Sequence, residues 1–212
     1  MRRFLLTLVH EGYAKQQGKQ FSLTAKVLDL GFSYLSTLDI WHSAKPLMNE
    51  LVEQLNESCS AAVLDGSDVV YVARVATTKR VMSITLSVGN RLPVFVTSMG
   101  RALLADRSDP ALNNFINSCH IEQFTQYTLT DIKALKVEVA QVKAQGYSLV
   151  EQELEIGLTS ISVPVHNRSG EVIAALNVST HMSQTARQQI LSVILPALMD
   201  CAKAVERLGQ TS

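Results

Sequence analysis

Residues 59–75 read CSAAVLDGSDVVYVARV, and this stretch decides the class of fold. Apolar residues run on both sides of Asp65 and Gly66, a dipeptide that favours a tight hairpin turn. The stretch therefore predicts two antiparallel strands that meet at this turn. The segment VMSITLSV at 81–88 keeps the period of two, so we expect a third strand there.

The C-terminal half predicts three more strands. One short strand follows Gly146, and two others flank the turn at 168–171. Amphipathic segments between the strands predict helices, which we place at about 2–12, 25–38, 39–58, 99–106, 110–119, 130–146 and 184–208. Pro46 and Pro196 should start, bend or kink the helices that contain them. Strands joined by hairpins and mixed with helices indicate an α+β fold with an antiparallel sheet rather than a doubly wound parallel one.

Composition narrows the class of protein. The 212 residues are 47% hydrophobic and 18% charged, which is typical of a folded globular chain. The apolar runs are shorter than a membrane span and no signal peptide opens the chain. Cys59, Cys119 and Cys201 are widely spaced and odd in number, which favours free thiols in a reducing compartment. We therefore expect a cytoplasmic protein without a membrane segment.

Metal and cofactor chemistry have little support in the sequence. There is no CxxC pair, and the five histidines do not cluster. No glycine-rich phosphate loop is present. We expect neither a metal nor a cofactor.

The junction VGNRLPVFVTSMGRALLAD at 88–106 is the strongest candidate for a binding site. An apolar strand pattern runs into Thr97 and Ser98, and a short helix begins at about Met99. Free N–H groups and the positive end of the helix dipole at such a junction suit a carboxylate or a phosphate. The alternative is an ordinary helix N-cap.

Catalysis at this junction is not expected. A nucleophile elbow needs glycine two residues before the serine, and Val96 stands there before Ser98. Glu151, Glu153 and Glu155 form an acidic loop, which we interpret as solvated because no second catalytic partner stands out. The sequence names no catalytic residue and does not predict an enzyme.

The basic residues concentrate at the N-terminus. Residues 1–38 hold five basic and two acidic side chains, whereas the remainder holds 14 basic and 17 acidic ones. A helix with Arg2 and Arg3, followed by a hairpin with Lys15 and Lys19, has the form of the second half of a winged helix-turn-helix. These four residues are candidate DNA contacts, the alternative being a solvated helix end. The first two helices of such a module are absent, so we expect this chain not to bind operator DNA selectively.

Several segments together resemble the IclR family of bacterial transcriptional regulators. They are RRFLLTLVHEGYA and FSLTAKVLDLGFSYL near the start, then VGNRLPVFVTSMGRALLA, EQELEIGLTSISVPV and GEVIAALNVS. Their order and spacing are similar to the family over essentially the whole chain, and RLPVFVTSMGRALLA is most similar to the branch that regulates aromatic-acid breakdown. The resemblance implies a partial winged helix-turn-helix at 1–24, a linker helix at 25–40 and a GAF-like effector domain with a curved sheet at 41–212.

The resemblance also implies which residues contact an effector. Ser98, Met99 and Gly100 would offer a backbone cradle, and Ser160, Asn177 and Ser179 would line the pocket from the late strands. The alternation of Asn177 and Ser179 places both on one strand face, which supports a polar lining independently. Arg101 could pair with an acid or face solvent. Val150 stands where some relatives have an aspartate that contacts the ligand, so either Glu151 or Glu153 is expected to provide that contact.

The sequence therefore predicts a ligand-responsive transcriptional regulator of catabolic genes. Its effector would be a small carboxylic acid, most simply an aromatic one, and operator DNA would be its partner in the full-length protein. The family implies a homodimer or tetramer. Two alternatives remain at this point: a small-molecule enzyme on a similar scaffold, and a dimerisation module that binds no ligand.

Overall fold

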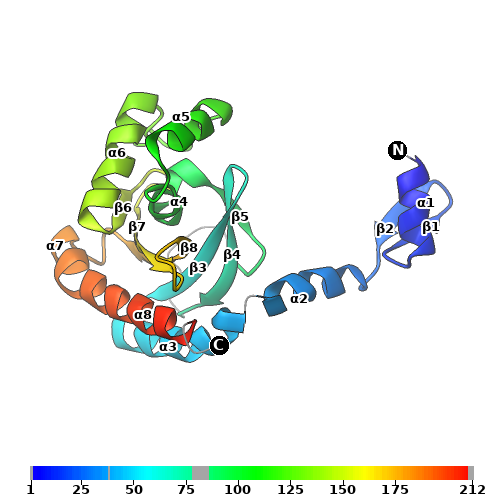
Figure 1. The fold of residues 1–212 in the computed structure, drawn as a ribbon, viewed down its shortest axis with the longest axis horizontal. Helices are drawn as coiled ribbons and strands as arrows, with labels where there is room; N and C mark the ends of the chain where they lie inside the picture. The colour runs from blue at the N-terminus through cyan, green and yellow to red at the C-terminus, as the bar shows by residue number, and fades with distance from the viewer. Residues whose placement is uncertain (1, 38, 78–85, 210–212) are drawn as a thin grey trace. The chain divides into compact units, whose positions relative to one another are not determined.

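A six-stranded antiparallel sheet organises the larger part of the chain in this computed structural model (Figure 1), which describes residues 2–37, 39–77 and 86–209. The strand order is β5-β4-β3-β8-β7-β6. The strands are β3 (Ser58–Asp65), β4 (Asp68–Val75), β5 (Arg91–Pro93), β6 (Ser148–Glu151), β7 (Leu158–His166) and β8 (Val172–His181). The predicted hairpin is confirmed, because Asp65 pairs with Asp68 around Gly66, whose φ of 59° suits a tight turn.

Helices cover both faces of the sheet. α4 (Ser98–Leu104) packs on β7 and β8 from one face, with α5 (Asp109–Ser118) and α6 (Ile132–Gln145) beyond it. α3 (Asp39–Leu55) and α8 (Leu195–Leu208) lie against the other face. The central strands are consequently buried on both sides, as the run of five buried residues in β8 shows. The α+β class with helices on an antiparallel sheet is confirmed.

Three local features differ from the expectations or fall outside them. The strand pattern of 88–106 stops at Pro93, and Val94–Val96 form a 3-10 turn, because proline lacks the N–H that would continue the pairing. α3 runs through Pro46 rather than starting there. The strand expected over 81–88 lies mostly outside the described residues.

The C-terminal helical stretch runs from Arg187 to Leu208. α7 (Arg187–Gln189) leads into a π-helical turn over Ile190–Ile194, and α8 follows with Pro196 in its first turn. The irregularity expected near Pro196 is this π-helical turn, where the helix widens. Proline has no N–H to donate to the preceding turn, which favours such a widening.

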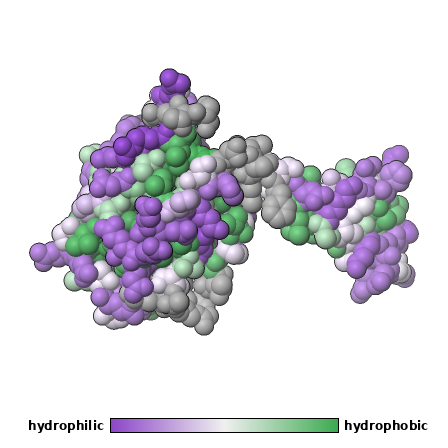
Figure 2. Space-filling view, turned by 90° about the horizontal axis from the view of Figure 1, so that it is seen from below, coloured by the Kyte–Doolittle hydropathy of each residue, from purple (hydrophilic) through white to green (hydrophobic). Residues whose placement is uncertain are grey.

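This stretch is also the one helix of the described residues that is long and apolar enough to cross a membrane. Its buried residues form a single stripe that includes Ile190, Ile194, Leu198 and Val205, and α8 packs on β7 and β8. Hydrophilic residues occupy much of the face on which α3 and α8 lie (Figure 2). One apolar face and one hydrophilic face are typical of a core helix.

The first compact unit covers Met1–His42, and the second covers Ser43–Ser212. In the first unit, α1 (Arg2–His10) precedes a hairpin of β1 (Ala14–Gln17) and β2 (Gln20–Leu23), and α2 (Val27–Thr37) follows. The hairpin turns at Gly18, whose φ is 61°. Lys26 holds the end of α1 to the start of α2, because its ammonium donates to the Glu11 carbonyl at 2.8 Å.

Candidate functional site

A pocket opens at the start of α4, on the face of the sheet that α4 covers. Its open space is about 360 Å³ including solvent at the mouth, but only about 20 Å³ of this is free for a water-sized group. Because small-molecule sites occupy roughly 300–1,000 Å³, the lining side chains would have to move to admit a ligand. Five of the residues predicted from the sequence line it, namely Ser98, Met99, Ser160, Asn177 and Ser179. The structure therefore brings together residues that lie more than 60 positions apart in the chain.

The floor of the pocket is a cluster of hydroxyl and amide groups. Ser160 and Ser179 are direct partners across β7 and β8, and Ser98 approaches from α4 with 2.7 Å between its Oγ and that of Ser160. Asn177 Nδ2 donates to Ser160 Oγ at 2.9 Å and to Ser179 Oγ at 3.0 Å. Asn177 Oδ1 is buried and has no hydrogen-bond partner. One amide atom of Asn177 is thus without a partner inside the protein.

The start of α4 supplies backbone donors. Thr97 caps the helix, because its Oγ1 accepts from the Gly100 N–H at 3.1 Å, and the Thr97 carbonyl accepts from the Arg101 N–H. The first N–H groups of a helix have no partner inside it. Here those of Ser98 and Met99 belong to residues that line the pocket.

Gly100 serves packing rather than lining the pocket. A Cβ at this position would overlap the carbonyl and Cα of Val94, so only glycine lets α4 sit this close to the 3-10 turn. The cradle expected from Ser98, Met99 and Gly100 therefore reduces to its first two residues, with Gly100 behind them.

Arg101 reaches the pocket only through another side chain. It is 2% exposed, its Nε donates to the Phe95 carbonyl at 3.0 Å, and its guanidinium donates to Glu153 at 2.7 Å. Glu153 lines the pocket and also accepts from the Leu129 N–H at 2.9 Å. The charge of Arg101 is therefore already balanced inside the protein.

Glu151 does not line the pocket. Its carboxylate pairs with Arg187 at the start of α7, while Val150 on the preceding position faces the pocket. Of the two glutamates that the sequence left open, the structure thus places Glu153 rather than Glu151 at the pocket wall.

Apolar side chains and one tyrosine complete the wall. Leu92, Val150, Leu154 and Leu158 form an apolar slot beside the polar floor. Tyr71 of β4 lines it as well, and burial raises the pKa of Tyr71 to about 12, so its hydroxyl stays protonated. Tyr71 is not among the residues predicted from the sequence.

A second, larger groove lies elsewhere on this unit. It holds about 870 Å³ of open space between α6, α8 and β7. His166 at its edge already uses both its ring Nδ1 and its backbone N–H to bind Glu206, at 2.7 and 2.8 Å. Because these polar groups satisfy one another, the pocket at α4 is the better candidate site.

The pocket lacks the geometry of nucleophilic catalysis. Ser98 Oγ faces another serine hydroxyl, whereas an activated serine needs a base within hydrogen-bond reach. Within the described residues, no group of three or more histidine, cysteine or acidic side chains could hold a metal. The arrangement suits the binding of a small polar molecule.

Comparison with known proteins gives the family. The sequence model described as "Bacterial transcriptional regulator IclR C-terminal" matches residues 32–207. The chain belongs to the IclR family. It is 44% identical over 203 residues to the Pca regulon regulatory protein of Pseudomonas putida, which covers 96% of this chain and 70% of that relative.

Solved IclR-family structures agree with the fold. A transcriptional regulator from Rhodococcus sp. RHA1 superposes with a TM-score of 0.85 at 40% identity, covering 99% of this chain and 84% of that one. The inducer-binding domain of PobR from Acinetobacter, a double mutant in complex with 3-hydroxybenzoic acid, superposes with a TM-score of 0.74 at 30% identity, covering 79% and 98%. Because the relatives are named as transcriptional regulators, the expectation of a regulator rather than an enzyme is confirmed.

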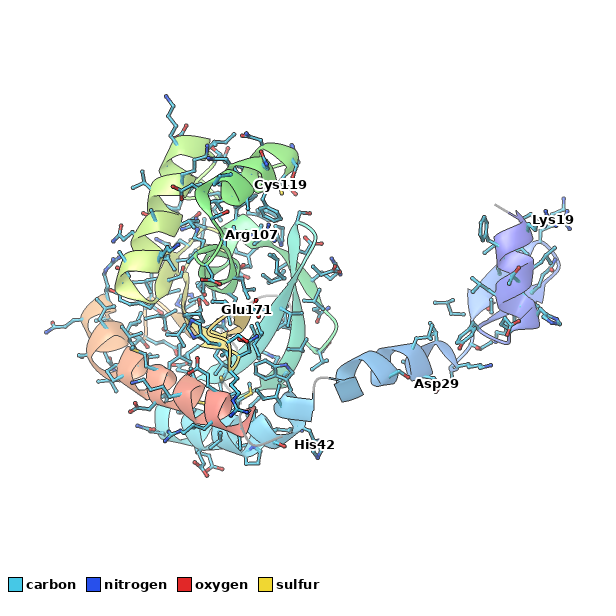
Figure 3. The ribbon with its side chains drawn as sticks, viewed as in Figure 1. Lys19, Asp29, His42, Arg107, Cys119 and Glu171 are labelled. Carbon is cyan, nitrogen blue, oxygen red and sulfur yellow. The ribbon has the colours of Figure 1, made fainter. Side chains whose placement is uncertain are left out.

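The four basic residues named as DNA contacts all lie in the first unit and are exposed. Arg2 and Arg3 begin α1, Lys15 lies in β1, and Lys19 is in the turn that joins β1 and β2 (Figure 3). Their contact with DNA stays a prediction.

Proposed function

We propose that this IclR-family chain is a cytoplasmic, ligand-responsive regulator of catabolic genes whose second unit binds a small aromatic carboxylic acid in the pocket at α4. The observation that carries the proposal is the buried Asn177 amide with one unpartnered atom, beside the first N–H groups of α4. An unsatisfied buried polar group costs stability, and a ligand group that bonds to it removes the cost.

The amide of Asn177 suits a carboxylate in one of its two orientations. The oxygen and nitrogen of such an amide are assigned from the hydrogen-bond network. Turned by 180°, Oδ1 would accept from the hydroxyls of Ser160 and Ser179, and Nδ2 would be the group left to donate. Together with the N–H groups of Ser98 and Met99, it would give a carboxylate three donors.

The remaining wall has the apolar chemistry that suits the body of an aromatic acid, and it would open by side-chain movement to admit the ring. Leu92, Leu154 and Leu158 provide an apolar slot for a ring. The complex of the PobR inducer-binding domain with 3-hydroxybenzoic acid and the 44% identity to the Pca regulon regulatory protein support this class of ligand.

A thermal-shift screen of aromatic and keto acids tests the proposal. An acid at one hundred times its Kd should stabilise the protein by about 2.7 kcal/mol, which corresponds to a rise in Tm of roughly 5–10 °C. Asn177→Ala should lose most of this rise, whereas Asn114→Ala at an exposed position of α5 should keep it.

Two results would contradict the proposal. No rise in Tm with any acid would favour a dimerisation module that binds no ligand. Chemical conversion of a bound acid during long incubation, followed by mass spectrometry, would favour an enzyme.

We further propose that Arg2, Arg3, Lys15 and Lys19 contact DNA phosphates in the assembled regulator, which acts as a homodimer or tetramer. The exposed charges and the helix-plus-hairpin order of the first unit support this. The chain of 212 residues should bind DNA weakly and with little sequence preference. A mobility-shift assay that found tight, operator-selective binding would contradict this expectation.

A further inference from the structure

Arg74 of β4 is a partly buried cation without an anionic partner. Its guanidinium donates to Ser60 Oγ at 2.8 Å, and none of the ion pairs within the described residues includes it. Arg91, Arg101 and Arg187, by contrast, each pair with a carboxylate. A partly desolvated charge that lacks a counter-charge lowers the stability of the folded protein, so stability does not explain the presence of Arg74.

The register of the sheet places Arg74 on the pocket side. Ser60 pairs with Arg74 on β4 and with Asn177 on β8, so the three residues form one row on one face. A bulge between Ala61 and Ala62 brings Tyr71, which lines the pocket, onto this same face although it is three positions from Arg74.

Ser60 stands between Arg74 and Asn177 in this row. Neighbouring strands are about 4.8 Å apart, and Arg74 extends back over β3 to reach Ser60. From this register and the bond to Ser60, we infer that the charge of Arg74 lies roughly one strand spacing, about 5 Å, from the Asn177 side chain. The charge of Arg74 also acts on a residue of the pocket wall, because it opposes the rise in the pKa of Tyr71 that burial causes.

The other charges at the pocket cancel. Glu153 is the acidic residue in the pocket wall, and it is paired with Arg101 at 2.7 Å. Arg74 does not line the pocket itself, but it shares the sheet face that carries Asn177 and Tyr71, and no ion pair in the described part of the chain compensates its charge. Burial lowers the pKa of Arg74 from its ordinary value, which is the expected sign of a desolvated cation.

We propose that Arg74 is a positioning residue that supplies the counter-charge for the carboxylate of the effector, held between Asn177 and the start of α4. The inference rests on the proposed function of this pocket. Arg74 would select acids over neutral molecules of the same shape, because a charge about 5–8 Å away in a partly desolvated site changes the affinity for an anion by roughly 10- to 100-fold.

Paired titrations test this role. Calorimetry would measure the Kd of 4-hydroxybenzoate and of 4-hydroxybenzamide, and of any acid found by the thermal-shift screen with its amide, on the full chain. We expect the wild type to prefer the acid over its amide. Arg74→Gln should weaken the acid about 10- to 100-fold and leave the amide unchanged, and Arg74→Lys, which keeps the charge, should recover most of the acid affinity.

The controls separate this role from a structural one. Arg168→Gln removes a charge from the exposed turn between β7 and β8 and should not change either Kd. An equal loss for acid and amide in Arg74→Gln would show a structural effect and overturn the inference, as would an unchanged Kd for the acid. If the wild type binds no acid at all, the proposed function fails and this inference fails with it.

Discussion

The buried ion pair of Arg101 and Glu153 gives the sharpest test of how the pocket wall is held. Arg101 is 2% exposed and its guanidinium is 2.7 Å from the Glu153 carboxylate. Removing one partner of a buried pair costs about 3–5 kcal/mol, because the other charge is left without compensation in a low-dielectric site. Glu153→Leu and Arg101→Met should each lose stability of this order.

The double variant distinguishes the pair from two unrelated contacts. Replacing both partners by apolar residues leaves no unpaired charge, so it should be no less stable than either single variant. Urea unfolding followed by far-ultraviolet circular dichroism measures all four free energies of unfolding. For a chain of this size, the single variants should also lower Tm by roughly 6–20 °C.

An exposed pair of the same chemistry provides the control. Arg91 lies 2.7 Å from Asp65, but the two side chains are 46% and 65% exposed. Arg91→Met should therefore cost at most about 1 kcal/mol. Losses from the two core variants that simply add up in the double variant would refute the reasoning, as would a loss under 1 kcal/mol from Glu153→Leu.

Three further variants or reactions test other features of the fold. Gly100→Ala should destabilise the protein by about 1–3 kcal/mol because its Cβ overlaps backbone, whereas Gly31→Ala in α2, with open space around it, should be neutral or stabilising in thermal melts. Asp131→Ala removes the oxygen that caps α6 at the Ala134 N–H and should cost about 1 kcal/mol in urea unfolding; Ser108→Ala at the start of α5, where the side chain makes no cap bond, should cost less. Iodoacetamide at pH 8, followed by peptide mass spectrometry, should alkylate Cys119 (Figure 3) before the two buried cysteines, because burial raises the pKa of both buried thiols and keeps them protonated; equal rates at all three would contradict this.

The fold class could be predicted because its signals are local. The turn at Asp65 and Gly66, the cap at Asp131 and the alternation in β8 each depend on a few neighbouring residues. The same alternation correctly placed Asn177 and Ser179 on one face. A strand period alone does not show, however, that the pairing ends at Pro93 and that a 3-10 turn follows.

The positions of Gly100, Arg101 and Tyr71 relative to the pocket depend on contacts between distant segments. Gly100 and Arg101 lie within four positions of Ser98, yet the first faces Val94 and the second faces Glu153, which no local pattern reveals. Tyr71 was not predicted to line the pocket because a bulge shifts the register of β3 and β4. No residue type in the hairpin indicates this bulge.

The sheet face beneath α4 shows why this pocket is more than a gap in packing. Ser148, Ser162 and Asn177 are register partners across β6, β7 and β8, and each has a buried side-chain atom without a hydrogen-bond partner. An unsatisfied buried polar atom costs about 1–3 kcal/mol, which alanine at the same position would avoid. On the opposite face, the same strands carry Ile161 and Val178 at full burial. Thr159 on that opposite face also has a buried hydroxyl without a partner, but it does not belong to such a row. A row of three costly polar residues beside Arg74, which has no counter-charge, is the arrangement expected where binding rather than stability determines the residues.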